Sequence, residues 1–283
     1  SHWRSVLAQS DSRGDLSSEV AAHFDSQSEA VPVMMHCAHD PDARIRAAAL
    51  NALFVTGTRS AEVRDAYVEA LRDPDRNVRA IAVASIGTWG PEASVALPEL
   101  TRLTHDRDKA FASVAEAAIW RIDARAAADA VGWRPIPQDE WGFTAMMPAH
   151  VDVRKSNAPG AKNKAVVHFY DARDDVNGYW ISVGQYPEGF FGAMTFEARL
   201  GHARDAFLLS VASKGALEKE EDIEFQGRKG RQLDLKYDGP LRATLRVFCE
   251  GDRFYVLLAQ TDQSLPKQEA AVYFFDSFRF PEK

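Results

Sequence analysis

The sequence predicts two domains. Residues 1–132 read as an all-α helical repeat, an α-solenoid, and residues 133–283 as an α+β domain whose antiparallel sheet is flanked by helices. Three observations support this division. A segment recurs every 33 residues in the first half. In the second half, the spacing of apolar residues changes from helical to alternating. Between the halves, the two prolines in Gly132-Trp133-Arg134-Pro135-Ile136-Pro137 forbid a continuous helix.

Composition narrows the class of protein. A chain of 283 residues is long enough for one large or two ordinary domains. With 46% hydrophobic and 27% charged residues, it has the composition of a soluble protein with real cores. The net charge of −7 disfavours nucleic acid as the main partner. No apolar run approaches the roughly 18 residues that a membrane-spanning helix requires, so we expect no membrane span.

Two cysteines and the start of the chain bear on location. Cys37 and Cys249 fall in different predicted domains, which argues against a disulfide framework or a redox motif. This favours a cytoplasmic location. The chain begins Ser1-His2-Trp3 without a methionine, so we expect a trimmed N-terminus, which leaves a periplasmic location open.

The recurring segment is an acidic turn. It occupies residues 39–49 and again residues 72–82, each time as Asp-Pro-Asp-x-x-hydrophobic-Arg-x-x-Ala. The copy at residues 105–115 keeps the acidic turn but loses the proline and the arginine. Helical spacing of apolar residues on both sides predicts a helix before and after each turn. We expect Asp75, the second carboxylate of its turn, to cap the following helix.

This pattern resembles HEAT repeats of the short bacterial kind over residues 28–125. Pro32 and Pro98, two periods apart, match the proline often found in the first helix of that family. The resemblance implies helix pairs that stack and present an extended surface to partners. We expect hydrogen-bonded charges to form a structural ladder between neighbouring turns, made by Asp40, Arg46, Asp73, Arg79 and Asp106. The alternative, that Arg46 and Arg79 contact a ligand, is less favoured because the repeat position itself explains them.

Alternating apolar residues predict strands in the second half. They cover residues 141–148, 164–170 and 179–186, and Asn177-Gly178 predicts a hairpin between the last two. A helix is expected from Thr195, a solvated loop at residues 218–222, a strand at 253–259 and a helix at 266–273. Strands 230–237 and 241–249 form a second predicted hairpin, pairing Lys236 with Arg242, Asp234 with Thr244, and Gln232 with Arg246.

Several landmarks of this half resemble the PsbP/Mog1-like fold. They are Phe-x-x-x-Met-Pro ending at Pro148, the strand ending Tyr186-Pro187, Gly227-x-x-Gly230-Arg231, Arg253-Phe254-Tyr255-Val256 and Phe275-Asp276-Ser277-Phe278. The resemblance covers residues 138–281 and implies a non-enzymatic module. One branch of that fold assists photosystem II and another binds a small GTPase. No functional residue of either branch maps onto this chain.

The sequence offers no convincing catalytic, cofactor or metal site. His36 and His39 share a helix face, but Cys37 points about 100° away and no second ligand pair follows at a zinc-site spacing. Cys249 and His168 lack the flanking motif of a thiol nucleophile. We therefore predict that the protein is not an enzyme and carries no cofactor.

Two features favour binding of another protein. Phe190 and Phe191 lie between glycines, where they form an exposed anchor or pack beneath the following helix or against the repeat domain. A small basic patch on one face of the second hairpin is a candidate contact for an acidic partner, but a solvated sheet face neutralised by Asp234 is the favoured interpretation of the same residues. The patch consists of Lys236, Arg242 and Arg246.

Together these features predict a non-enzymatic scaffold or accessory subunit of a bacterial complex, with other proteins as partners. Two alternatives remain at this point. One is a small-ligand-binding protein or enzyme with a pocket between its domains. The other is a regulator that binds a small GTPase, by analogy with one branch of the second fold.

Overall fold

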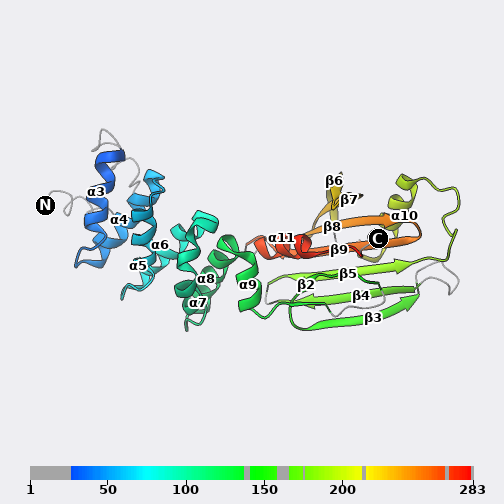
Figure 1. The fold of residues 1–283 in the computed structure, drawn as a ribbon, viewed down its shortest axis with the longest axis horizontal. Helices are drawn as coiled ribbons and strands as arrows, with labels where there is room; N and C mark the ends of the chain where they lie inside the picture. Colours follow the sequence, from blue (N-terminus) through cyan, green and yellow to red (C-terminus); the bar gives the residue numbers. More distant parts are fainter. Residues whose placement is uncertain are drawn as a thin grey trace. The chain divides into compact units, whose positions relative to one another are not determined.

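The computed structural model describes residues 27–136, 141–157, 166–174, 176–211, 215–264 and 268–281. The chain divides into two compact units, Ser1–Ala127 and Ala128–Lys283 (Figure 1). The division falls within a helix, Ala124–Ala130, rather than at the proline-containing segment. The first 26 residues of the predicted repeat domain, and small parts of the predicted strand 164–170 and helix 266–273, lie outside the described residues.

The first unit is helical. Four α-helices precede the 3-10 segment η1 in the described residues, and three follow it. The boundary between the two units falls within the last of them, α9. The elements are α3 (Gln27–Cys37), α4 (Ala43–Thr56), α5 (Ala61–Ala70), α6 (Arg76–Ile86), η1 (Gly87–Ala96), α7 (Leu97–Leu103), α8 (Lys109–Ile122) and α9 (Ala124–Ala130).

The three acidic turns share one hydrogen-bonding pattern. The first aspartate accepts a bond from the backbone N–H of the second, at 2.9 Å for Asp40, 2.8 Å for Asp73 and 2.9 Å for Asp106. The second aspartate then caps the next helix, because the first N–H groups of a helix have no partner within it. Asp75, for example, accepts from the N–H groups of Asn77 and Val78, which confirms the predicted cap. Two carboxylates per turn thus explain why this segment recurs.

The predicted fold class is wrong. The chain has a mixed α+β fold, and an all-α solenoid is not evident in its described residues. Where the third helix pair is expected, the backbone leaves helical geometry at Gly90, with φ 60° and ψ −146°, and Pro91 follows. Proline cannot donate the backbone bond that continues a helix. The chain therefore forms the 3-10 segment η1 and the seven-residue α7 in place of a regular repeat.

The second unit contains a seven-stranded sheet in the order β3-β4-β5-β9-β8-β7-β6, with antiparallel neighbours throughout. A separate two-stranded sheet joins β1 (Arg134–Pro135) to β2 (Met146–Met147). The large sheet consists of β3 (Val151–Asn157), β4 (Val166–Arg173), β5 (Gly178–Gln185), β6 (Ala216–Phe225), β7 (Arg228–Lys236), β8 (Leu241–Glu250) and β9 (Arg253–Asp262).

Two helices pack on opposite faces of this sheet. Leu200 of α10 (Phe196–Val211) packs with Leu245 of β8 in one buried cluster. Phe275 of α11 (Gln268–Ser277) stacks under Arg246, the next residue of the same strand, at 4.4 Å. Because successive strand side chains point to opposite faces, α10 and α11 must cover different sides. The α11 side is strongly aromatic: Phe274 lies 5.3 Å from the ring of Tyr179.

Both predicted hairpins are confirmed. β4 and β5 pair around the segment that ends in Asn177-Gly178. In the second hairpin, Lys236 pairs with Arg242, Asp234 with Thr244, and Gln232 with Arg246, which is the predicted register. The opposite face carries the buried apolar residues of the α10 cluster.

The predicted loop at residues 218–222 is wrong, because these residues lie in the edge strand β6. Their acidic composition is compatible with a strand that has a neighbour on one side only, where charges also discourage edge-to-edge association. The neighbouring strand compensates the charge: Arg231 of β7 pairs with Glu220 and Asp222. The other edge, β3, was likewise not predicted.

Substitutions at two glycines, one in the sheet and one in α10, test the packing of the sheet. A Cβ atom at Gly230 would lie 2.6 Å from the carbonyl oxygen of Val247, which cannot move without disturbing β8. We expect Gly230→Ala to lower the free energy of unfolding by about 1–3 kcal/mol. Gly201 of α10 has open space around it, so Gly201→Ala should raise it by up to about 1 kcal/mol. Urea denaturation measures both, and equal effects would contradict this packing.

Candidate functional site

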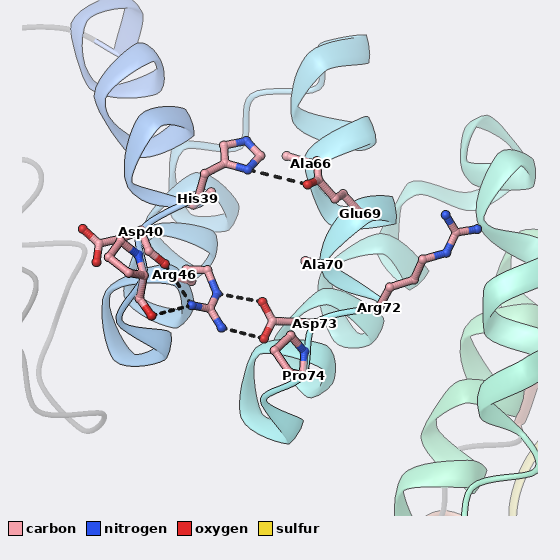
Figure 2. A pocket seen from close by; sticks show the side chains of 11 residues that line it. His39, Asp40, Arg46, Ala66, Glu69, Ala70, Arg72, Asp73 and Pro74 are labelled. Atoms are coloured by element: carbon pink, nitrogen blue, oxygen red, sulfur yellow. Dashed lines mark hydrogen bonds and ion pairs between the residues drawn. The ribbon is translucent and has the colours of Figure 1, made fainter.

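A groove opens between two acidic turns of the first unit (Figure 2). The α3–α4 turn forms one wall, and α5 with the α5–α6 turn forms the other. Its volume is about 480 Å³. Small side chains and prolines alternate with charged groups along it. The lining residues are Ala38, His39, Asp40, Pro41, Arg46, Ala66, Glu69, Ala70, Arg72, Asp73 and Pro74.

Arg46 ties the two walls together. Its Nε and Nη2 atoms donate to the two carboxylate oxygens of Asp73, each at 2.7 Å. Its Nη1 atom donates to the backbone carbonyls of Asp40 at 2.8 Å and Pro41 at 3.1 Å. The guanidinium therefore holds oxygens of both turns at once, in the planar bidentate geometry that makes arginine–carboxylate pairs strong.

This pair is well shielded, since the side chains of Arg46 and Asp73 are only 14% and 10% exposed. Partial burial alone would raise the pKa of the Asp73 carboxyl. The bonds from Arg46 and from the backbone N–H of Asp75 outweigh burial and lower that pKa below its ordinary value. The carboxylate form of Asp73 is thus the form that this fold stabilises.

Arg79 reproduces only part of the arrangement. Its Nη1 atom donates to the carbonyls of Asp73 at 2.9 Å and Pro74 at 3.0 Å. Within the described residues, however, it makes no ion pair with Asp106 and instead lies over the ring of Phe111, at 5.8 Å. The predicted ladder therefore has a complete step between the first two turns and an incomplete one at the third.

The rim of the groove carries looser charges. Nδ1 of His39 lies 3.7 Å from a carboxylate oxygen of Glu69, and both side chains are more than half exposed. Arg72 extends away toward the next helices (Figure 2). It pairs with Glu99 at 2.7 Å. His39 and Glu69 are thus accessible to a partner and only loosely paired, whereas the exposed Arg72 is engaged by Glu99. Sequence reasoning missed Glu69, whose only signal was its position near the acidic turn.

His36, Cys37 and His39 do not point toward a common site. Cys37 is buried, which raises the pKa of its thiol, while His36 and His39 are exposed. Among the described residues, no group of three or more His, Cys, Asp or Glu side chains is placed to hold a metal ion.

The two phenylalanines between glycines separate. Phe191 is 3% exposed and packs with Val167, Tyr186 and Phe254. Phe190 is 44% exposed, and its ring lies 4.8 Å from that of Tyr186. Phe191 is therefore packed in the interior, and Phe190 is the one of the two that is exposed as an anchor would be.

The three expected basic residues do not form one patch. Lys236 and Arg242 both approach Glu218 of β6, at 3.8 Å and 3.5 Å. Arg246 is covered by Phe275 of α11 and donates to Gln232 at 3.0 Å. Burial lowers the pKa of its guanidinium. Glu218 could not be placed from the sequence because its segment was predicted to be a loop.

Comparison with known proteins identifies only distant likenesses. No protein-family model matches the chain. No curated protein matches it either. Among solved structures, the PsbP protein of the cyanobacterium Synechocystis is similar with 9% identity over 53% of this chain and 93% of that one, at a TM-score of 0.36. A protein of unknown function, PA94 from Pseudomonas aeruginosa, is similar with 13% identity over 54% of this chain and 99% of that one, at 0.30. At these TM-scores, neither likeness carries an argument about activity.

A search of the described helices finds none that is both long and apolar enough to span a membrane.

Two arginines of α4 test the tie across the groove. We expect Arg46→Gln to lower the free energy of unfolding at pH 7 by about 1.5–3 kcal/mol, because the carboxylate of Asp73 loses its charged partner. Arg44→Gln is the matched control, since Arg44 is exposed and, among the residues that the structure describes, its guanidinium bonds only to Asp42, its own helix cap. It should leave stability nearly unchanged.

The pH dependence of this effect has a definite sign. The lowered pKa of Asp73 contributes stability above the unfolded-state value, about 3.9, and that contribution disappears as the pH falls through the folded-state value. The difference between wild type and Arg46→Gln should therefore be largest above about pH 4 and shrink below it. Urea denaturation across this range measures it, and a pH-independent difference would contradict the role of this pair.

Proposed function

We propose that this protein is a non-enzymatic accessory or scaffold protein, and that the groove at the acidic turns of the first unit binds a partner protein. One observation carries the proposal. The groove is held open by the shielded Arg46–Asp73 pair, while His39 and Glu69 remain exposed along its rim. A rigid floor with accessible charges at its edge is the arrangement expected of a docking surface, where buried contacts fix geometry and rim contacts steer the partner.

The two arginines of the groove suit binding better than catalysis. A catalytic group needs a free functional atom directed at the substrate, and usually a neighbour that tunes its pKa. Here the guanidinium of Arg46 is held by two turns, and that of Arg72 is engaged by Glu99. Such paired groups are poor general acids or bases but good fixed elements of a surface.

The lining also suits a polypeptide. Ala38, Ala66 and Ala70 leave room for side chains of a partner to approach the helix backbones closely. The exposed His39–Glu69 pair spans 3.7 Å and contributes little to stability, so a partner can replace it with its own charges at small cost. In the second unit, the exposed ring of Phe190 is a further candidate contact, since aromatic side chains are enriched among the strongest contributors to interfaces.

A charge reversal tests this proposal. We expect Glu69→Lys to abolish recovery of the same native partner by affinity purification and mass spectrometry, because it places a cation beside His39 and reverses the rim charge. Glu92→Lys is the matched control: Glu92 is similarly exposed and makes a similarly long ion pair, 3.8 Å to Arg59, but lies outside the groove. It should retain the partner.

Circular dichroism of both variants checks that the fold is intact. Recovery of the protein alone in repeated purifications of the wild type would contradict an accessory role. A partner that Glu69→Lys retains as fully as Glu92→Lys does would contradict the assignment of the groove.

A further inference from the structure

The second unit contains a small hollow on the face of the sheet that α10 covers. Strands β4, β5 and β9 form its floor, and α10 forms one wall. Its volume is about 150 Å³. The lining residues are Val167, Phe169, Ser182, Gly184, Tyr186, His202, Ala203, Ala206, Phe207, Phe254 and Val256. None of them carries a carboxylate, an ammonium or a guanidinium group.

The hollow results from small residues on α10 and β5, which leave space between the helix and the sheet. Leu200 seats α10 in the apolar cluster formed with β7, β8 and β9, to one side of β4 and β5. Toward the hollow, this helix presents His202 and Phe207, and between them Ala203 and Ala206, whose side chains are too small to fill the space. The floor lacks a side chain at Gly184, where an added Cβ atom would meet Val167 only at an ordinary contact distance of 3.5 Å. The space is therefore a consequence of sequence and not of a strained backbone.

The walls of the hollow are mainly aromatic. The ring of Tyr186 lies 5.6 Å from that of Phe254 in an edge-on arrangement, and the ring of His202 lies 6.3 Å from Tyr186. Aromatic rings prefer edge-to-face or offset contact with another ring. The walls therefore favour a flat aromatic group over an aliphatic chain. The lack of carboxylate, ammonium and guanidinium groups in the lining favours an uncharged one.

Three lining residues have polar side-chain atoms, namely Ser182, Tyr186 and His202, and only Ser182 lies on the strands of the floor. Ser182 of β5 pairs across the sheet with Phe169 on one side and Val256 on the other, both of which also line the hollow. Within the described part of the chain, the Ser182 hydroxyl makes no hydrogen bond to another residue. A hydroxyl can both donate and accept, so it can bind a single hydroxyl group on a ring.

We infer that this hollow binds a free, uncharged phenol-type ring, with the hydroxyl of the ring directed to Ser182. The volume supports a single ring, since an apolar cavity of about 150 Å³ in another protein binds benzene. A mostly apolar concavity with a few placed polar groups is also the usual composition of small-molecule sites. Because the hollow has space for one ring only, it favours a free molecule. A tyrosine side chain of a partner would also need space for the backbone attached to it. This inference does not rest on the proposed function of the first unit.

Titrations followed by protein NMR test it, with phenol and benzene as probes. Phenol should produce saturable shifts in wild-type protein and bind about three- to tenfold more tightly than benzene, which corresponds to one net hydrogen bond. Ser182→Ala should abolish this preference while leaving benzene binding unchanged. Ala206→Leu should fill the hollow and weaken both probes at least about tenfold, as expected for a lost apolar site. Ala198→Leu, on the same helix but outside the hollow, should bind both as wild type does.

Four outcomes would overturn the inference. They are the absence of saturable shifts with phenol, unchanged binding in Ala206→Leu, tighter binding of N-acetyl-tyrosinamide than of p-cresol, and tighter binding of tetramethylammonium than of phenol. The third would show that the ring belongs to a protein partner, and the fourth that the aromatic walls select a cation. Should Ala206→Leu fail to fold, the comparison of phenol with benzene in Ser182→Ala decides the matter alone, because that substitution removes only one oxygen atom.

Discussion

The first unit depends on the bond network of one guanidinium. Arg46 donates to the two carbonyls of its own turn and to both carboxylate oxygens of Asp73 in the next. The helices that flank the turns are packed through buried residues such as Leu50, Leu71 and Val78. The directional bonds of Arg46 add a fixed geometry between the turns themselves. That geometry helps define the groove. The Arg46–Asp73 pair, which belongs to the repeated motif of the sequence, therefore also shapes the accessible surface.

The groove of the first unit and the hollow of the second differ in kind, and the difference suits separate uses. The groove of the first unit has paired charges, small side chains and exposed polar rim residues, which suit a polypeptide surface. The hollow of the second unit has aromatic walls and few polar side chains, among them Ser182 on its floor, which suit a small ring. Each site is built from residues of its own unit. Ligand binding in the second unit and partner binding in the first can therefore be examined with independent variants.

Features that depend on neighbouring residues alone, such as hairpin register and helix caps, could be predicted from the sequence. The register of the β7–β8 hairpin followed from side-chain alternation around Asp238-Gly239-Pro240, and the cap of α6 from the position of Asp75. Edge strands escaped prediction because a strand with one neighbour, such as β6, loses the apolar alternation that marks a buried one. The solenoid prediction failed because a regular period was extended across Gly90 and Pro91. The ring-sized hollow was invisible because it arises from missing side chains, at Gly184 and Ala206, in segments distant along the chain.

Site-specific photo-crosslinking tests the central claim most directly. A benzophenone-bearing residue is placed at Ala70, which lines the groove, or at Val95, which is exposed on η1 outside it. The two proteins are then irradiated in native extract. The groove account predicts that one partner protein crosslinks from position 70 and not from position 95, and that Glu69→Lys removes this crosslink. The same crosslinked proteins from both positions, or no crosslink from position 70, would contradict it.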